Sequence, residues 1–153
     1  MDLHDSDNRS IRIAIAQAQF NRKVTDMLLA GCRRALKQAG LTEDRVDVFS
    51  VPGAWELPLA ARQLAAAGHY DGIIALGAVV RGETAHFEFI SAECARGLQQ
   101  VSLDSGLPVG FGVLTPENDE QAEKRADPER MDKGREAAEA VLAMLELKQQ
   151  IAQ

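Results

Sequence analysis

Cysteine is scarce in this sequence, and long apolar runs are absent. Its 153 residues include two cysteines, Cys32 and Cys94, which lie far apart and form no CxxC pair. We therefore expect no disulfide framework and no zinc site, and reduced thiols in the cytoplasm fit this pattern best. No apolar run approaches the ~20 residues that span a bilayer, and residues 1–10 lack the basic-then-apolar pattern of a secretory signal. A membrane partner is therefore not expected.

Positive charge is also in short supply. The 17 Lys and Arg residues are outnumbered by 23 Asp and Glu residues, which leaves a formal net charge of −6. Nonspecific binding to nucleic acid needs a positive field, so nucleic acid is not expected as a partner. The GxGxxG and GxxxxGK[ST] phosphate-binding signatures and the GxSxG nucleophile elbow are all absent. His4 and His69 lie in the N-terminal segment and in a different connection from His86, so no metal site is expected.

Strand-like and helix-like patterns alternate along the rest of the chain. Segment 45–51 alternates with period two, as a strand with one wetter face would, whereas the apolar runs at 71–80 and 107–114 indicate buried strands. With a further strand at 11–18, helices are expected at 24–39, 55–67, 87–105, 115–126 and 132–150. Four strands separated by helices imply right-handed crossovers and a parallel sheet. We therefore predict one domain at 11–153, a flavodoxin-like three-layer α/β sandwich with a four-stranded parallel sheet flanked by helices, and a disordered or extended arm at 1–10.

The loops at the carboxyl ends of the strands hold the best candidates for chemistry, because ligands of parallel α/β sheets bind at this edge. In the loop RGETAHFE, Thr84 either caps a helix or holds an anion against exposed amides. An unperturbed imidazole titrates near pH ~6.5, so His86 could move protons at neutral pH. The simpler alternative for His86 is a surface or packing residue at a helix start.

Two earlier loops and the later basic residues offer further candidates. Phe20 can stack on a flat heterocycle, and Asn21 can hydrogen-bond a ligand or cap the following helix. Glu56, near a helix start, either complements the helix dipole or accepts hydrogen bonds from a polyol. For each of Phe20, Asn21 and Glu56 considered alone, a role in packing or at a helix end is the simpler interpretation. The basic residues from which a phosphate ligand could come are Lys124, Arg125, Arg130, Lys133 and Arg135.

Five segments, in this order and spacing, resemble the 6,7-dimethyl-8-ribityllumazine synthase family of riboflavin biosynthesis. They are FN at 20–21, VPGAWELPLAA at 51–61, ALGAVVRGETAHFEFI at 75–90, GVLTPENDEQAEKRA at 112–126 and DKGREAA at 132–138. The resemblance implies a transferase that condenses 5-amino-6-(D-ribitylamino)uracil with 3,4-dihydroxy-2-butanone 4-phosphate and releases phosphate and water. It implies no metal and no organic cofactor. The alternatives are a noncatalytic flavin- or lumazine-binding protein and a shell-forming paralogue.

The same resemblance implies a role for each matching residue. His86 would be the general acid/base, and Arg125 would bind the phosphate and help expel it. The pyrimidine would stack on Phe20, the ribityl chain would lie on 54–56, and the phosphate would bind at the turn 83–84. In the family a neighbouring subunit completes the site. The substrate-binding residues implied are Phe20, Asn21, Ala54, Trp55, Glu56, Val79, Val80, Glu83 and Thr84, with Phe111 and Lys133, like Arg125, from the neighbour.

The resemblance also bears on assembly. It implies a homopentamer, and it leaves open whether pentamers join into an icosahedral sixty-subunit shell. The segment DPERMD at 127–132 lacks the glycine-rich turn frequent in shell formers, and Asp132 stands where Asn commonly precedes Lys-Gly. Trp55 replaces the Phe often found at its position, which keeps an aromatic there. Riboflavin synthase is a candidate partner.

Overall fold

The computed structural model of the chain describes residues 10–153, so the predicted N-terminal arm lies outside the described residues apart from Ser10. Four strands form one sheet: β1 (Ile13–Ala18), β2 (Val46–Val51), β3 (Gly72–Ala78) and β4 (Val109–Leu114). They lie in the order β2-β1-β3-β4, and every neighbouring pair is parallel. The predicted parallel sheet is confirmed.

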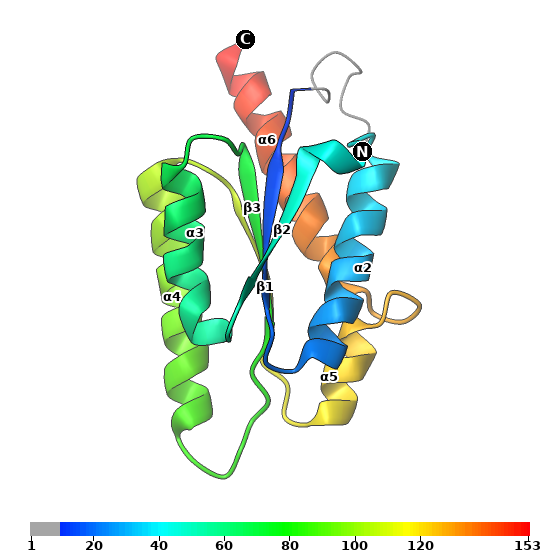
Figure 1. Cartoon of the computed structure of the whole chain (residues 1–153), viewed down its shortest axis with the longest axis vertical. Coiled ribbons are helices and arrows are strands. Elements are labelled where there is room, and N and C mark those ends of the chain that lie inside the picture. The colour runs from blue at the N-terminus through cyan, green and yellow to red at the C-terminus, as the bar shows by residue number, and fades with distance from the viewer. Residues whose placement is uncertain (1–9) are drawn as a thin grey trace.

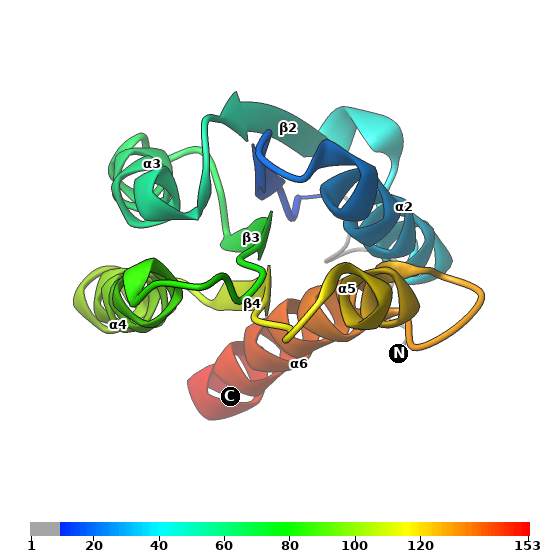
Figure 2. The same cartoon turned by 90° about the horizontal axis from the view of Figure 1, so that it is seen from below.

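Helices cover both faces of the sheet, as Figures 1 and 2 show. One face carries α2 (Arg22–Gln38), α5 (Asp119–Ala126) and α6 (Lys133–Ala152), and the other carries α3 (Leu57–Ala66) and α4 (His86–Ser105). Two short 3₁₀ turns, η1 (Glu43–Arg45) and η2 (Ala54–Glu56), flank β2. The elements follow the predicted order, and the flavodoxin-like three-layer α/β architecture is confirmed. Within residues 10–153 no helix is long and apolar enough to cross a membrane.

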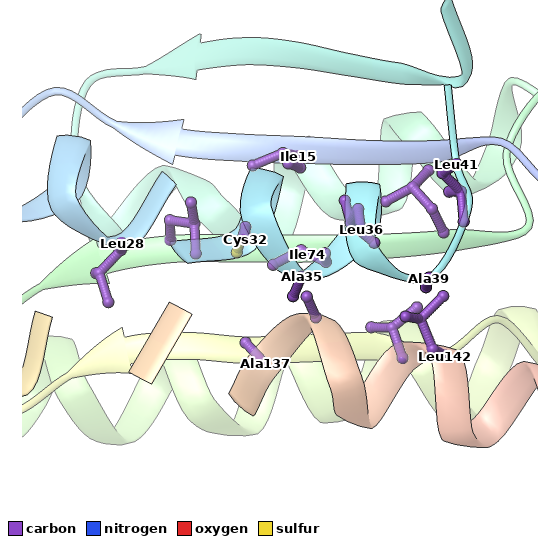
Figure 3. Close-up of a cluster of buried hydrophobic side chains, with 14 of the residues drawn as sticks. Ile15, Leu28, Cys32, Ala35, Leu36, Ala39, Leu41, Ile74, Ala137 and Leu142 are labelled. Atoms are coloured by element: carbon purple, nitrogen blue, oxygen red, sulfur yellow. The ribbon is translucent and has the colours of Figure 1, made fainter. Parts of the chain in front are cut away.

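The two central strands, β1 and β3, are buried on both faces, and their side chains alternate between two apolar clusters. Ile15 and Ile74 lie in the cluster under α2 and α6, together with Leu28 and Leu142 (Figure 3). On the opposite face, Ile73 joins a second cluster under α3 and α4. A core on each side of the sheet holds the carboxyl ends of the strands at one edge of the molecule, at the bottom of Figure 1.

Three local expectations need correction. The apolar run at 107–114 predicts a buried strand, and most of β4 is buried, but Phe111 is 44% exposed on this edge strand. The helix expected from Thr115 begins at Asp119 instead. Asn118 caps it, because its Oδ1 accepts a hydrogen bond from the Gln121 amide at 2.8 Å. Strand β2 is only partly covered, but its burial does not alternate as its sequence pattern predicts: none of its residues is fully buried, and Phe49 and Ser50 are both exposed.

Helices α2 and α6 approach each other closely at two glycines. A Cβ at Gly134 would overlap the carbonyl oxygen of Leu28 and would lie 2.8 Å from its carbonyl carbon. Asp132 has a left-handed backbone (φ 52°), and its buried Oδ1 has no hydrogen-bond partner among the described residues, while Oδ2 lies 3.2 Å from Arg135 Nε. A Cβ at Gly31 would overlap that Oδ1. The amino end of α6 is therefore seated against α2 without spare volume.

Candidate active site

A cavity of about 760 Å³ opens at the carboxyl edge of the sheet. Its walls are Phe20 in the loop after β1, the η2 turn after β2, the end of β3 and the first turns of α4. We call it the carboxyl-edge pocket. The predicted site residues that line it are Phe20, Ala54, Trp55, Glu56, Val79, Val80 and His86. Segments far apart in the sequence thus meet in one hollow, at the edge that the parallel topology predicts.

Exposed aromatic side chains surround this pocket. Phe20 and Phe89 are each 69% exposed, and Trp55 is also exposed. Aromatic rings around a mainly apolar hollow are suited to stack on a flat ligand. Phe89 is a lining residue that the motif segments do not single out. Its helical spacing is the signal that could reveal it, because a residue three positions after His86 lies on the same helix face.

Phe20 and Asn21 are held by the two neighbouring strand ends. The Phe20 amide donates to the Pro52 carbonyl oxygen at 3.0 Å, and Asn21 Nδ2 donates to the Ala78 carbonyl oxygen at 3.2 Å. Asn21 occupies the N-cap position of α2, as the capping alternative expects, but its side chain makes no cap hydrogen bond. Its side chain instead ties this loop to the end of β3. Asn21 does not line the pocket, and its contact with a substrate stays a prediction.

The Glu56 carboxylate faces the pocket without a partner among the described residues of its chain. Glu56 occupies the N-cap position of α3, yet its side chain makes no cap hydrogen bond. Within residues 10–153, neither a hydrogen bond nor an ion pair engages this carboxylate. An ionised carboxylate offers only acceptor sites, so Glu56 is suited to receive hydrogen bonds from ligand hydroxyl groups.

The loop between β3 and α4 carries the residues predicted for proton transfer and anion binding. The Val79 amide donates to the Leu114 carbonyl oxygen at 2.8 Å, which anchors the start of the loop to β4. Helix α4 begins at His86, whose amide donates to Thr84 Oγ1 at 3.4 Å. Glu83, Thr84 and His86 are all exposed, and only His86 of these three lines the pocket. The amino end of a 20-residue helix favours an anion beside it.

Three predicted residues lie elsewhere in the chain. Phe111, Arg125 and Lys133 line a second hollow, of about 460 Å³, between β4, α5 and α6. Arg125 Nη1 donates to the Gln121 carbonyl oxygen at 3.2 Å, and Lys133 Nζ lies 2.7 Å from Glu136 Oε2. The second hollow shares no lining residue with the carboxyl-edge pocket. A single chain therefore carries the predicted site in two separate parts.

The two cysteines belong to neither part. Both are buried free thiols. Burial raises the pKa of Cys32 to about 12, with a further contribution from the Asp132 carboxylate, and burial raises the pKa of Cys94 to about 11. Because the thiolate is the reactive form, neither side chain is poised as a nucleophile.

The fold and the carboxyl-edge pocket together define a class of protein: a parallel α/β sandwich with a small-molecule site at the carboxyl ends of its strands. The family described as 6,7-dimethyl-8-ribityllumazine synthase matches residues 10–149. Relatives of that name from two strains of Nitratidesulfovibrio vulgaris, DP4 and Hildenborough, are each 45% identical over 145 residues, which covers 95% of this chain and 93% of the relative. The chain belongs to the 6,7-dimethyl-8-ribityllumazine synthase family.

Proposed function

We propose that this chain condenses 5-amino-6-(D-ribitylamino)uracil with 3,4-dihydroxy-2-butanone 4-phosphate to give 6,7-dimethyl-8-ribityllumazine, phosphate and water. This reaction is the penultimate step of riboflavin biosynthesis, and the enzyme is a transferase. Family membership along nearly the whole chain supports the reaction. The structural observation that carries the proposal is the carboxyl-edge pocket, where aromatic rings, an unpaired carboxylate and an imidazole meet. No observation favours the noncatalytic alternative.

The pyrimidine substrate occupies the carboxyl-edge pocket in this proposal. The pyrimidine ring stacks on Phe20, and the backbone of Val79 and Val80 forms hydrogen bonds with the polar edge of the ring. The ribityl chain lies along η2, where the unpaired Glu56 carboxylate accepts hydrogen bonds from its hydroxyl groups. The aromatic rim and the acceptor thus suit the two chemically different ends of this substrate.

The butanone phosphate binds beside His86. Its phosphate lies at the turn of Glu83 and Thr84, next to the amino end of α4, where exposed amides favour an anion. The amine of the pyrimidine adds to the ketone, water leaves as the imine forms, phosphate departs, and ring closure expels water again. Each of these steps moves protons, and a positioned imidazole typically accelerates such steps by ~10²–10⁴-fold. Holding both substrates in one pocket supplies much of the remaining acceleration.

A neighbouring chain completes the site. Arg125 and Lys133 of the neighbour hold the phosphate, and its Phe111 covers the pyrimidine ring. The separation of the two hollows within one chain supports this arrangement, because the cations lie apart from His86 in their own chain. A head-to-tail interface closes into a ring when its rotation closes. We infer a cytoplasmic homopentamer, because the family resemblance implies a ring of five. An icosahedral shell and association with riboflavin synthase are further levels of assembly to be tested by solution mass.

The reaction is tested by incubating the purified protein with both substrates and following lumazine absorbance together with phosphate release. We expect both products to appear together, and absence of the lumazine would overturn the proposal. His86→Ala should lower kcat by about 10²-fold or more with both substrates saturating. The matched control is His69→Ala, because His69 is an exposed histidine outside the pocket.

The role of Arg125 is tested by the KM values. Arg125→Ala should raise the KM for the butanone phosphate and leave the KM for the pyrimidine unchanged, because it removes a phosphate ligand. It should also lower kcat with both substrates saturating, because Arg125 helps expel the phosphate. Arg130→Ala, at an exposed arginine outside both hollows, is the control. An unchanged KM for the butanone phosphate in Arg125→Ala would contradict the assignment of Arg125 as a phosphate ligand.

A further inference from the structure

Arg81 lies three residues after the end of β3 and contacts two other segments, the first turn of α4 and the loop before α5. Its Nη1 pairs with Glu88 Oε1 in the first turn of α4, and its Nε lies 2.8 Å from Glu117 Oε2 in the loop before α5. The guanidinium carbon lies 4.4 Å from the centroid of the Phe87 ring, within the range of a cation–π contact. The Arg81 amide also donates to the Pro116 carbonyl oxygen at 3.0 Å.

These contacts close the loop that carries Glu83, Thr84 and His86. Within the described residues, the amides from 82 to 85 donate no backbone hydrogen bond, so the loop itself has little to hold its shape. Arg81 precedes the loop, and Glu88 follows it. Their ion pair therefore joins the two ends of the loop, while Glu117 connects both ends to the segment that leads into α5.

The same contacts show why Arg81 is not itself an anion ligand in this arrangement. Two carboxylates already neutralise its guanidinium, and one face of the group is covered by Phe87. The pKa of Arg81 is raised chiefly by its hydrogen bond with Glu88, and the same bond lowers the pKa of the Glu88 carboxyl. A phosphate would have to displace a carboxylate to reach Arg81, and Arg81 does not line the carboxyl-edge pocket.

We propose that Arg81 is a positioning residue, which clasps the loop of residues 82–86 to α4 and to the loop before α5 and so presets Glu83, Thr84 and His86 for the butanone phosphate. This role rests on the proposed condensation. It acts chiefly on the phosphate substrate, because the pyrimidine contacts proposed at Phe20 and Glu56 lie on other loops, and Val79 is anchored separately by its amide hydrogen bond to the Leu114 carbonyl oxygen. The motif that contains His86 thus includes an arginine whose function is to hold the loop in shape.

The test compares Arg81→Ala with Arg96→Ala. Arg96 is the matched control, because it pairs with Glu93 at 2.7 Å on the same helix and touches no part of the loop. Arg81→Ala should raise the KM for the butanone phosphate roughly three- to tenfold and leave the pyrimidine KM within about twofold. Arg81→Lys keeps the charge but loses the forked contact. Its KM for the butanone phosphate should therefore lie between those of Arg81→Ala and Arg96→Ala. Equal changes in both KM values, or none, would overturn the proposal.

Two further measurements separate positioning from phosphate binding. Glu117→Gln should raise the KM for the butanone phosphate, because it loosens the clasp; a lower KM would identify Arg81 as a phosphate ligand and overturn the proposal. Hydrogen exchange of the free protein should be faster at the Arg81, His86 and Phe89 amides in Arg81→Ala, because these amides donate the hydrogen bonds at the two ends of the loop. Unchanged exchange at these amides would also overturn the proposal. If the wild-type protein made no lumazine, the proposed function would fail, whereas hydrogen exchange would still decide whether Arg81 clasps the loop.

Discussion

Gly134→Ala tests how tightly the amino end of α6, which carries Lys133, is seated on α2. The new Cβ would overlap the Leu28 carbonyl oxygen and lie 2.8 Å and 3.0 Å from the Leu28 carbonyl and α carbons. All three are backbone atoms, so the overlap is relieved only when one helix moves against the other. Overpacking of this kind costs about 3 kcal/mol at the upper end of its usual range. Alanine favours a helix over glycine by about 1 kcal/mol, which leaves a net destabilisation of about 2 kcal/mol.

The assay is thermal unfolding at one fixed protein concentration, because subunit association also shifts the midpoint. For a chain of this length, the expected loss lowers the midpoint by about 4–8 °C. Gly82→Ala is the control, since a Cβ at Gly82 meets no atom within 4 Å. The shift of α6 should also raise the KM for the butanone phosphate through Lys133. A Gly134→Ala protein as stable as the wild type would refute the packing argument.

Two further predictions concern buried polar groups. Asp132→Asn should raise the unfolding midpoint, because the amide keeps an acceptor for Arg135 and removes a buried charged oxygen that has no partner among the described residues. Asn also suits the left-handed backbone at this position. A lower midpoint would contradict this prediction. At pH 8 an alkylating reagent should label Cys32 and Cys94 only after denaturation, because their raised pKa values keep the native thiols protonated. Above pH 9.0, the ordinary pKa of an exposed thiol, the thiols of the unfolded chain lose protons that the native thiols keep. The free energy of unfolding should therefore fall as pH rises toward 11, and it should fall less steeply in Cys32→Ala. Rapid labelling of the native protein, or a free energy of unfolding that does not change between pH 9.0 and 11, would contradict the raised thiol pKa values.

Much of the fold can be predicted because its determinants are local. Apolar runs and helical periodicity locate four strands and five helices within a few residues of their observed bounds. The exposure of Phe111 cannot be predicted, because an apolar run reads the same whether a neighbouring element covers it or not. The start of α5 is also ambiguous in the sequence, since both Thr115 and Asn118 are plausible caps, and only the Asn118 contact with Gln121 decides between them.

The candidate site is predictable where the parallel topology alone brings residues together. Phe20, Glu56 and His86 follow three different strands, and the strand order places their loops around one pocket. The motif segments do not reveal Phe89, because its place in the pocket depends on its helical spacing from His86. Arg81 resembles any exposed charge in the sequence, since its two carboxylate partners come from α4 and from the loop before α5. Such contacts depend on tertiary packing, which no local pattern reports.

The central claim is that neighbouring chains share each site, and co-assembly of two inactive variants tests it most directly. His86→Ala and Arg125→Ala chains would be produced separately and together, and turnover would be measured with both substrates saturating. In a randomly mixed ring, about a quarter of the sites take an intact His86 from one chain and an intact Arg125 from its neighbour. We predict recovery of about a quarter of wild-type kcat in the mixed assemblies. Turnover no higher than that of the two variants alone would contradict the shared site.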